Sequence, residues 1–190
     1  VWADLNGRVN AIIDAGPCLI GVESTVVDCT TPVPTLLRPG GITLEMLTAA
    51  VGAVEIDPAL GGKENIVPRS PGMKYTHYAP NAPMILLEGP AGSVAMVMRQ
   101  EIDKALAAGK IVGAVVAQET VGLLPSSIIT AVYGSRLDSR QVAANLYNAL
   151  RCFDEQHVDV IYAEGIEEAG IGRAVMNRLR KASGYRIIKV

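Results

Sequence analysis

The run IVGAVVA at residues 111–117 is apolar throughout and includes three valines and one isoleucine. A strand that is hydrophobic on both sides is typical of the interior of a parallel sheet, where helices cover both faces. Further strand-like runs occupy Met84–Leu87, Thr130–Tyr133, Val158–Ala163 and Arg186–Val190. These runs predict about five strands, mainly parallel, within residues 83–190.

The segments between these runs show helical spacing, with an apolar residue about every four positions. The first predicted helix starts at a Ser93 cap and stops at Gly109. The second starts with Asp138 and Gln141 as a capping box, and the third stops at Gly184. The three apolar faces are Val94, Met98, Ile102 and Leu106, then Val142, Leu146, Leu150 and Phe153, then Ile171, Val175 and Leu179. Alternating strands and helices predict a small Rossmann-like α/β domain at residues 83–190.

Residues 1–57 contain shorter strand-like runs separated by prolines and glycines. The expected elements are strands at Ala11–Asp14, Ser24–Cys29 and Thr35–Leu37, and a helix at Leu44–Val51 between a Thr43 cap and a Gly52 stop. So short a region with so few apolar side chains makes a poor independent domain. We therefore expect the chain to be part of a longer protein, whose N-terminal part completes this sheet.

Charge and composition limit the classes of function. The net charge is −2 and Lys and Arg form no run, which favours a small-molecule ligand over direct binding to nucleic acid. Three cysteines and two histidines have no metal-site spacing, so we predict no metal site in this chain and expect a reducing cytoplasmic compartment. No apolar run reaches the length of a membrane span.

Two segments stand out as candidates for function. The first is GVESTVVD at residues 21–28, followed by LLRPGG at residues 36–41. The hydroxyls of Ser24 and Thr25 and the guanidinium of Arg38 fall at strand ends, where they suit a carboxylate or a phosphate. The alternative, slightly favoured by composition alone, is an edge strand with polar residues at its start and an Arg–Asp surface pair.

The second segment, SPGMKYTHYAP at residues 70–80, lies in an irregular region at residues 58–82. Its prolines and glycine fix the backbone, while its aromatic and basic side chains suit an adenine or a polyphosphate. The alternative is a strap between two domains whose rings simply pack. The residues alone favour neither interpretation.

These two segments, in this order and at this separation, strongly resemble the Sua-type threonylcarbamoyl-AMP synthases. In that family a YrdC-like catalytic domain is joined to a smaller C-terminal domain by a linker reading S-P-G-M-(K/R)-Y-x-H-Y-A-P. The run RAVMNRL at residues 173–179, after GIG, resembles the last helix of the family. The resemblance covers the whole chain and implies the C-terminal part of the YrdC-like α/β domain at 1–57, an ordered interdomain linker or lid at 58–82, and the Rossmann-like C-terminal domain at 83–190.

The resemblance implies the synthesis of threonylcarbamoyl-AMP and pyrophosphate from threonine, bicarbonate and ATP, for the threonylcarbamoyladenosine modification of tRNA. It implies no covalent nucleophile, so no catalytic residue is assigned. The implied contacts are threonine at Ser24 and Thr25, and ATP at Arg38, Tyr75, Thr76, His77 and Tyr78. Magnesium is expected mainly in the part of the protein outside this chain.

The K-x-R and S-x-N elements of the family are not in this sequence. We therefore expect this chain alone to be inactive. The expected downstream partner is the tRNA threonylcarbamoyl transferase machinery, without direct tRNA binding by this chain. Two alternatives remain: carbamoyl transfer of the hydrogenase-maturation type, against which the linker argues, and a non-catalytic RNA-binding or ligand-sensing module.

Overall fold

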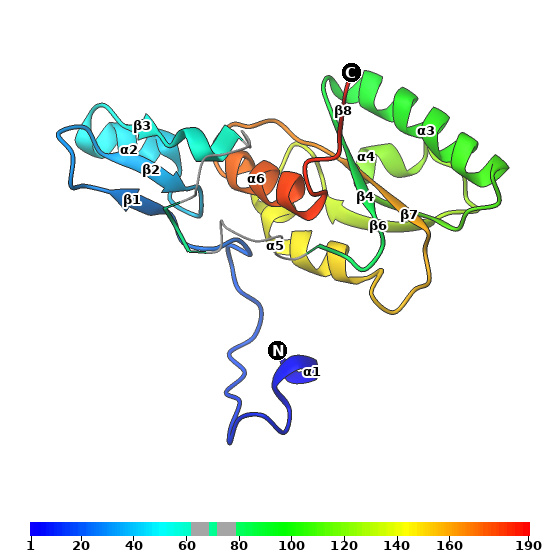
Figure 1. The fold of residues 1–190 in the computed structure, drawn as a ribbon, viewed down its shortest axis with the longest axis horizontal. Helices are drawn as coiled ribbons and strands as arrows, with labels where there is room; N and C mark the ends of the chain where they lie inside the picture. The colour runs from blue at the N-terminus through cyan, green and yellow to red at the C-terminus, as the bar shows by residue number, and fades with distance from the viewer. Residues whose placement is uncertain (62–68, 72–78) are drawn as a thin grey trace.

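The computed structural model of the 190-residue chain describes residues 1–61, 69–71 and 79–190. Figure 1 shows two sheets, with helix α6 (Gly172–Ala182) between them. We call β1–β3 the small sheet and β4–β8 the large sheet. No helix in the described part of the chain has both the length and the hydrophobicity that a membrane span requires.

The small sheet contains β1 (Val26–Asp28), β2 (Thr35–Arg38) and β3 (Glu55–Ile56), in that order. Strands β1 and β2 are antiparallel, while β2 and β3 are parallel and connected through α2 (Leu44–Val51). The helix has the predicted bounds. Its Thr43 hydroxyl accepts from the Met46 amide, and Gly52 ends it with a φ of 84°. No residue of α2 is buried, so this region has little core of its own.

The strand predicted at Ala11–Asp14 is wrong, because these residues have no regular structure. The short helix α1 (Trp2–Leu5) precedes them. A strand needs a neighbour for its backbone hydrogen bonds and for the apolar side chains of one face. Ile13 is 94% exposed, and Leu19 further on is 96% exposed, so these two apolar side chains contribute to no core.

The large sheet is wholly parallel, as the sequence predicts. Its strands are β4 (Met84–Glu88), β5 (Val112–Ala117), β6 (Ile129–Gly134), β7 (Val160–Glu164) and β8 (Ile187–Lys189). The strand order is β6-β5-β7-β4-β8, and each neighbouring pair is parallel. All six residues of β5 are buried, which explains its unbroken apolar run.

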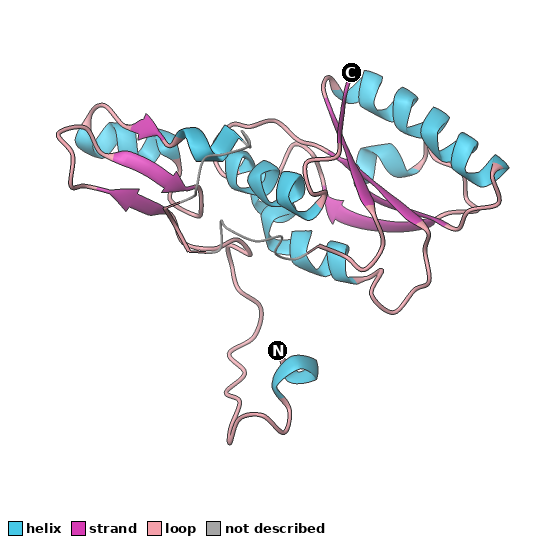
Figure 2. Cartoon of the chain, viewed as in Figure 1, coloured by secondary structure: helices cyan, strands magenta, loops and turns pink. Residues whose placement is uncertain are grey.

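Helices cover both faces of the large sheet (Figure 2). Helix α3 (Ala91–Ala107) packs on one face, and α5 (Ser139–Arg151) and α6 pack on the other. Alternate residues of β5 belong to the two cores: Val115 lies in the core under α5 and α6, whereas Val116 lies in the core under α3. The apolar helix faces predicted from the sequence pack against the strand residues in both cores, and Val175 and Leu179 fix α6 on the large sheet.

Two predicted helix starts need correction. Helix α3 begins at Ala91, and its N-cap is Pro90 in an extended conformation, which offers no side-chain hydrogen bond. Ser93 lies inside the helix. Asp138 does cap α5 by accepting from two backbone amides. Gln141, however, accepts a hydrogen bond from the Ser135 amide at 2.8 Å, so only half of the predicted capping box forms. The short α4 (Gln118–Val121), the turn of 3-10 helix at Pro58–Gly61 and β3 were not predicted.

Candidate active site

Arg38, at the end of β2, contacts the residue that the sequence analysis paired with it. Its Nη2 donates to the Ser24 hydroxyl at 3.0 Å, and its Nε donates to the Ser24 carbonyl at 3.0 Å. The antiparallel pairing of β1 and β2 places Val26 opposite Arg38, which brings Ser24 within reach. Ser24 is exposed and Arg38 half-buried, so a ligand in solution can reach both side chains.

The LRPGG turn holds this arrangement in place. A Cβ atom at Gly40 would clash with the Glu23 carbonyl oxygen and the Thr25 amide nitrogen, so the close approach of the turn requires glycine. The Thr25 hydroxyl donates to the Ile42 carbonyl at 2.6 Å and accepts from the Ile42 amide at 3.1 Å. Thr25 therefore fastens the turn to the residues around Ser24.

Arg69 and Pro71 connect the start of the SPGM segment to the same site. Arg69 forms ion pairs with Asp28 at 2.8 Å and with the buried Asp57 at 3.1 Å. The Pro71 carbonyl accepts from Arg38 Nη1 at 3.0 Å. Asp28 thus pairs with Arg69 rather than with Arg38, so the guanidinium of Arg38 faces Ser24 and the linker instead of a surface carboxylate.

Helix α6 brings two more cations to this site, which the sequence analysis missed. Arg178 Nε contacts the Glu23 carboxylate at 2.6 Å, and the side chains of Arg178 and Lys181 are both buried. Burial, and then the positive charges of Arg178 and Arg38, lower the pKa of Lys181 from 10.5 to about 8, while Glu23 acts in the opposite direction. Arg38, Arg178 and Lys181 therefore form one cation cluster, with Glu23 as its nearby carboxylate.

The cation cluster gives the site a positive field beside an exposed hydroxyl. Among the described side chains whose charges act on Lys181, Arg178 and Arg38 are cationic and Glu23 is anionic, and cationic side chains of this kind suit a phosphate or carboxylate ligand. Arg178 and Lys181 lie three residues apart and so share a face of α6. That spacing was visible in the sequence, but nothing in the sequence showed that this face meets Glu23.

Residues 72–78 lie outside the described residues, so the predicted ATP contacts Tyr75, Thr76, His77 and Tyr78 have no structural account here. Within the described ranges, no three His, Cys, Asp or Glu side chains come together to hold a metal ion. The side chains near Ser24 are mainly cationic, so these residues do not fit a magnesium ion.

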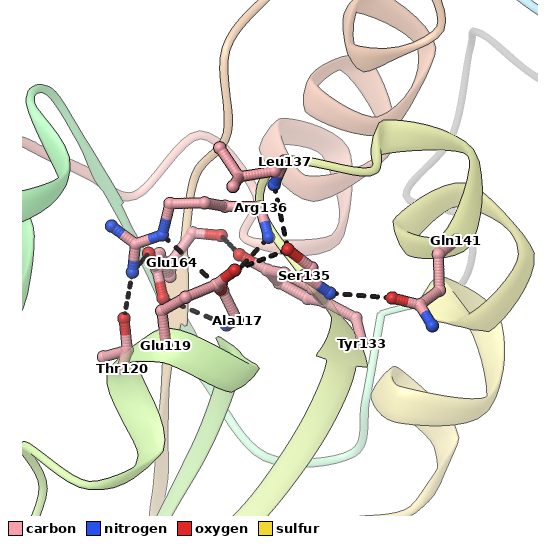
Figure 3. Close-up of polar contacts among 9 residues, drawn as sticks. All are labelled: Ala117, Glu119, Thr120, Tyr133, Ser135, Arg136, Leu137, Gln141 and Glu164. Atoms are coloured by element: carbon pink, nitrogen blue, oxygen red, sulfur yellow. Dashed lines mark hydrogen bonds and ion pairs between the residues drawn. The ribbon is translucent and has the colours of Figure 1, made fainter.

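A second polar cluster lies beyond the carboxyl ends of β5, β6 and β7 (Figure 3). The Glu164 side chain is 2% exposed, accepts from the Ala117 amide at 3.0 Å and pairs with Arg136 at 2.9 Å. Arg136 also donates to Thr120 at 2.5 Å, and Glu119 accepts hydrogen bonds from Ser135 and from the Arg136 amide.

Doubly wound sheets usually bind ligands at this edge. Here the two carboxylates are held by one arginine, backbone amides and hydroxyls of the same chain. Tyr133 closes the group by donating to the Glu164 carbonyl at 3.0 Å, and burial raises the pKa of its hydroxyl well above the usual range. We interpret this cluster as structural, because it ties three strand ends together and both carboxylates find their partners within it.

Comparisons with known proteins agree with the resemblance. The family model described as "Threonylcarbamoyl-AMP synthase, C-terminal domain" matches residues 42–184. Threonylcarbamoyl-AMP synthases of Bacillus subtilis and Pyrococcus abyssi are 45% and 47% identical to 98% and 100% of this chain. That of Schizosaccharomyces pombe is 34% identical over 96% of it.

The chain covers 52%, 54% and 47% of these three relatives, and so spans about half their length. The crystal structure of P. abyssi Sua5 complexed with L-threonine superposes with a TM-score of 0.89 at 46% identity, covering 100% of this chain and 54% of that one. The chain therefore belongs to the family of the threonylcarbamoyl-AMP synthase C-terminal domain.

Proposed function

We propose that the full-length protein containing this chain is an L-threonylcarbamoyladenylate synthase, which makes threonylcarbamoyl-AMP and pyrophosphate from threonine, bicarbonate and ATP for tRNA modification. Relatives with this name match nearly the whole chain. One structural observation carries the proposal: the Ser24–Arg38 pair lies beside the buried cations of α6. In this proposal, residues 1–57 complete a YrdC-like catalytic domain, residues 58–82 link it, and residues 83–190 form the C-terminal domain.

The proposed reaction needs positioning and charge neutralisation rather than a covalent nucleophile. A carbamate oxygen, formed from threonine and bicarbonate, attacks the α-phosphorus of ATP, and pyrophosphate leaves with the electron pair of the broken P–O bond. Arg38 is proposed to hold the ATP phosphates, and the positive charges of Arg178 and Lys181 are proposed to lower the cost of bringing polyanions together.

Ser24 is proposed to bind threonine. Its oxygen accepts from Arg38, while its hydroxyl proton stays available to donate to a carboxylate. The P. abyssi Sua5 structure contains L-threonine, which supports an amino-acid subsite in this family. Thr25 remains a proposed threonine contact, although a direct contact would have to replace one of its two bonds to Ile42.

Residues 75–78 are proposed to close over ATP as part of a lid. Support comes from the segment's start, where Arg69 is fixed by two carboxylates and the Pro71 carbonyl contacts Arg38. A lid fixed beside the phosphate-binding arginine excludes water from a labile mixed anhydride. Magnesium is proposed for the part of the protein outside this chain, and no step is assigned to it here.

The test uses the full-length protein and measures pyrophosphate release. Arg38→Ala removes charged hydrogen bonds worth about 1.5–3 kcal/mol, so kcat/KM for ATP should fall roughly 10- to 100-fold. Ser24→Ala should raise the KM for threonine while leaving ATP affinity nearly unchanged. Arg99→Ala, which breaks a surface pair with Asp103 on α3, is the matched arginine control and should behave as wild type. Unchanged kcat/KM for ATP in Arg38→Ala would refute the assignment.

A further inference from the structure

A cavity of about 160 Å³ lies between the small sheet and α6, separate from the cluster in Figure 3. Pro39, Ile56 and Leu60 form an apolar wall, and the polar wall contains Glu168 together with Arg173, Asn177 and Arg180 from α6. At about 30 Å³ per water, the space corresponds to roughly five water molecules. The space inside the cavity is therefore well below the size of a nucleotide.

The polar wall contains two buried atoms that lack hydrogen bonds. Within the described residues, Arg173 Nε and Asn177 Oδ1 are buried and have no hydrogen-bond partner. Asn177 is only 6% exposed. Buried polar groups in native proteins are nearly always paired, and leaving one unpaired costs about 1–3 kcal/mol. The two atoms call for a ligand that offers an acceptor to Arg173 and a donor to Asn177.

The charges around the cavity favour a ligand with both signs. Arg180 is already neutralised by Glu88, at 2.7 and 2.9 Å, and by Glu168. Alongside backbone hydrogen bonds, the charge of Arg173 already helps to lower the pKa of the Glu45 carboxyl, but its Nε has no hydrogen-bond partner in the described residues. Arg173 also lies in the first turn of α6, where the helix dipole favours a negative group. Asn177 follows four residues later, so it shares a face of α6 with Arg173.

We propose that this cavity binds a free aliphatic α-amino acid. The carboxylate would accept from Arg173, the ammonium group would donate to Asn177, and the side chain would pack on Pro39, Ile56 and Leu60. An α-amino acid carries its two charged groups on one carbon, which matches a donor and an acceptor placed side by side. Pro39 directly follows Arg38, and the polar wall comes mainly from α6, which carries Arg178 and Lys181. A ligand in the cavity would therefore contact both parts of the chain that form the cation cluster.

The inference does not depend on the proposed reaction, and binding tests it directly. Isothermal titration of the full-length protein with L-leucine should show one saturable site that Ser24→Ala and Arg38→Ala preserve. Asn177→Leu and Arg173→Met should each weaken binding at least 10-fold. Two partial probes, 4-methylpentanoate without the ammonium group and 3-methylbutylamine without the carboxylate, should also bind at least 10-fold more weakly.

Each contrary outcome is informative. No binding of L-leucine, or wild-type binding by Asn177→Leu and Arg173→Met, overturns the site. Loss of binding in Ser24→Ala assigns the amino acid to the proposed substrate site instead, and equal binding of 4-methylpentanoate overturns the zwitterion. Leu60→Trp, which fills the cavity from the opposite wall, tests the site again if a polar variant fails to fold by circular dichroism. A protein without synthase activity that still binds L-leucine would refute the proposed function and leave this inference standing.

Discussion

Lys181 offers the sharpest physical test of the cation cluster. Its pKa falls from the ordinary 10.5 to about 8, mainly through burial and then through the charges of Arg178 and Arg38. At about 1.4 kcal/mol per tenfold change in proton affinity, this corresponds to roughly 3 kcal/mol against the ammonium form. Lys181 nevertheless stays mostly charged at pH 7, because its pKa remains above that pH.

The sign of the effect on stability follows from proton linkage. Between pH 8 and 10.5 the unfolded chain binds a proton at Lys181 that the folded chain has released, so the free energy of unfolding rises with pH over this range. Below pH 8 both states are protonated and the folded state bears the full cost. Lys181→Met removes this titration, so the stability of the mutant relative to wild type should fall by roughly 3 kcal/mol between pH 7 and pH 10.5.

The pKa itself can be measured by carbon-13 NMR of the reductively methylated full-length protein, with Lys181→Met identifying the resonance. Lys104 is an internal reference, because the neighbouring Glu101 carboxylate raises the pKa of its ammonium group. We expect Lys181 to titrate near pH 8, well before Lys104. Titration of both lysines at or above 10.5, or a stability difference that ignores pH, would refute the reasoning.

Three further predictions concern other parts of the chain. Glu164→Gln removes the charge that faces Arg136 and should destabilise the protein by about 3–5 kcal/mol in urea unfolding; an equal stability of mutant and wild type would contradict a structural role for the Figure 3 cluster. Gly113→Ala places a Cβ 2.6 Å from the Phe153 ring and should cost about 1–3 kcal/mol, which Phe153→Leu should partly restore if the clash is the cause. Hydrogen exchange at residues 72–78 of the full-length protein should slow when ATP and threonine bind, with residues 112–117 as the unaffected control; exchange that ignores ligand would favour the passive strap.

Local patterns predicted most of the region after residue 83. Buried strands such as Val112–Ala117 and the four-residue spacing on α5 can be recognised in a short stretch of sequence. Both patterns arise because a strand or a helix turns its apolar side chains towards a core at regular intervals. Helix α2 was also predicted with its cap and stop. The strand expected at Ala11–Asp14 failed, since strand formation depends on a neighbour that local sequence does not specify.

By itself, the sequence determined the parallel α/β class and singled out Ser24 and Arg38. Only the tertiary structure decided the strand order β6-β5-β7-β4-β8 and which face of α6 meets the small sheet. Glu23 and Arg178 are far apart in the chain, and their contact at 2.6 Å depends on how two separate sheets pack around one helix. The cation cluster and the interface cavity both lie at that packing surface, because long-range packing, unlike helix or strand periodicity, leaves no regular spacing in the sequence to detect.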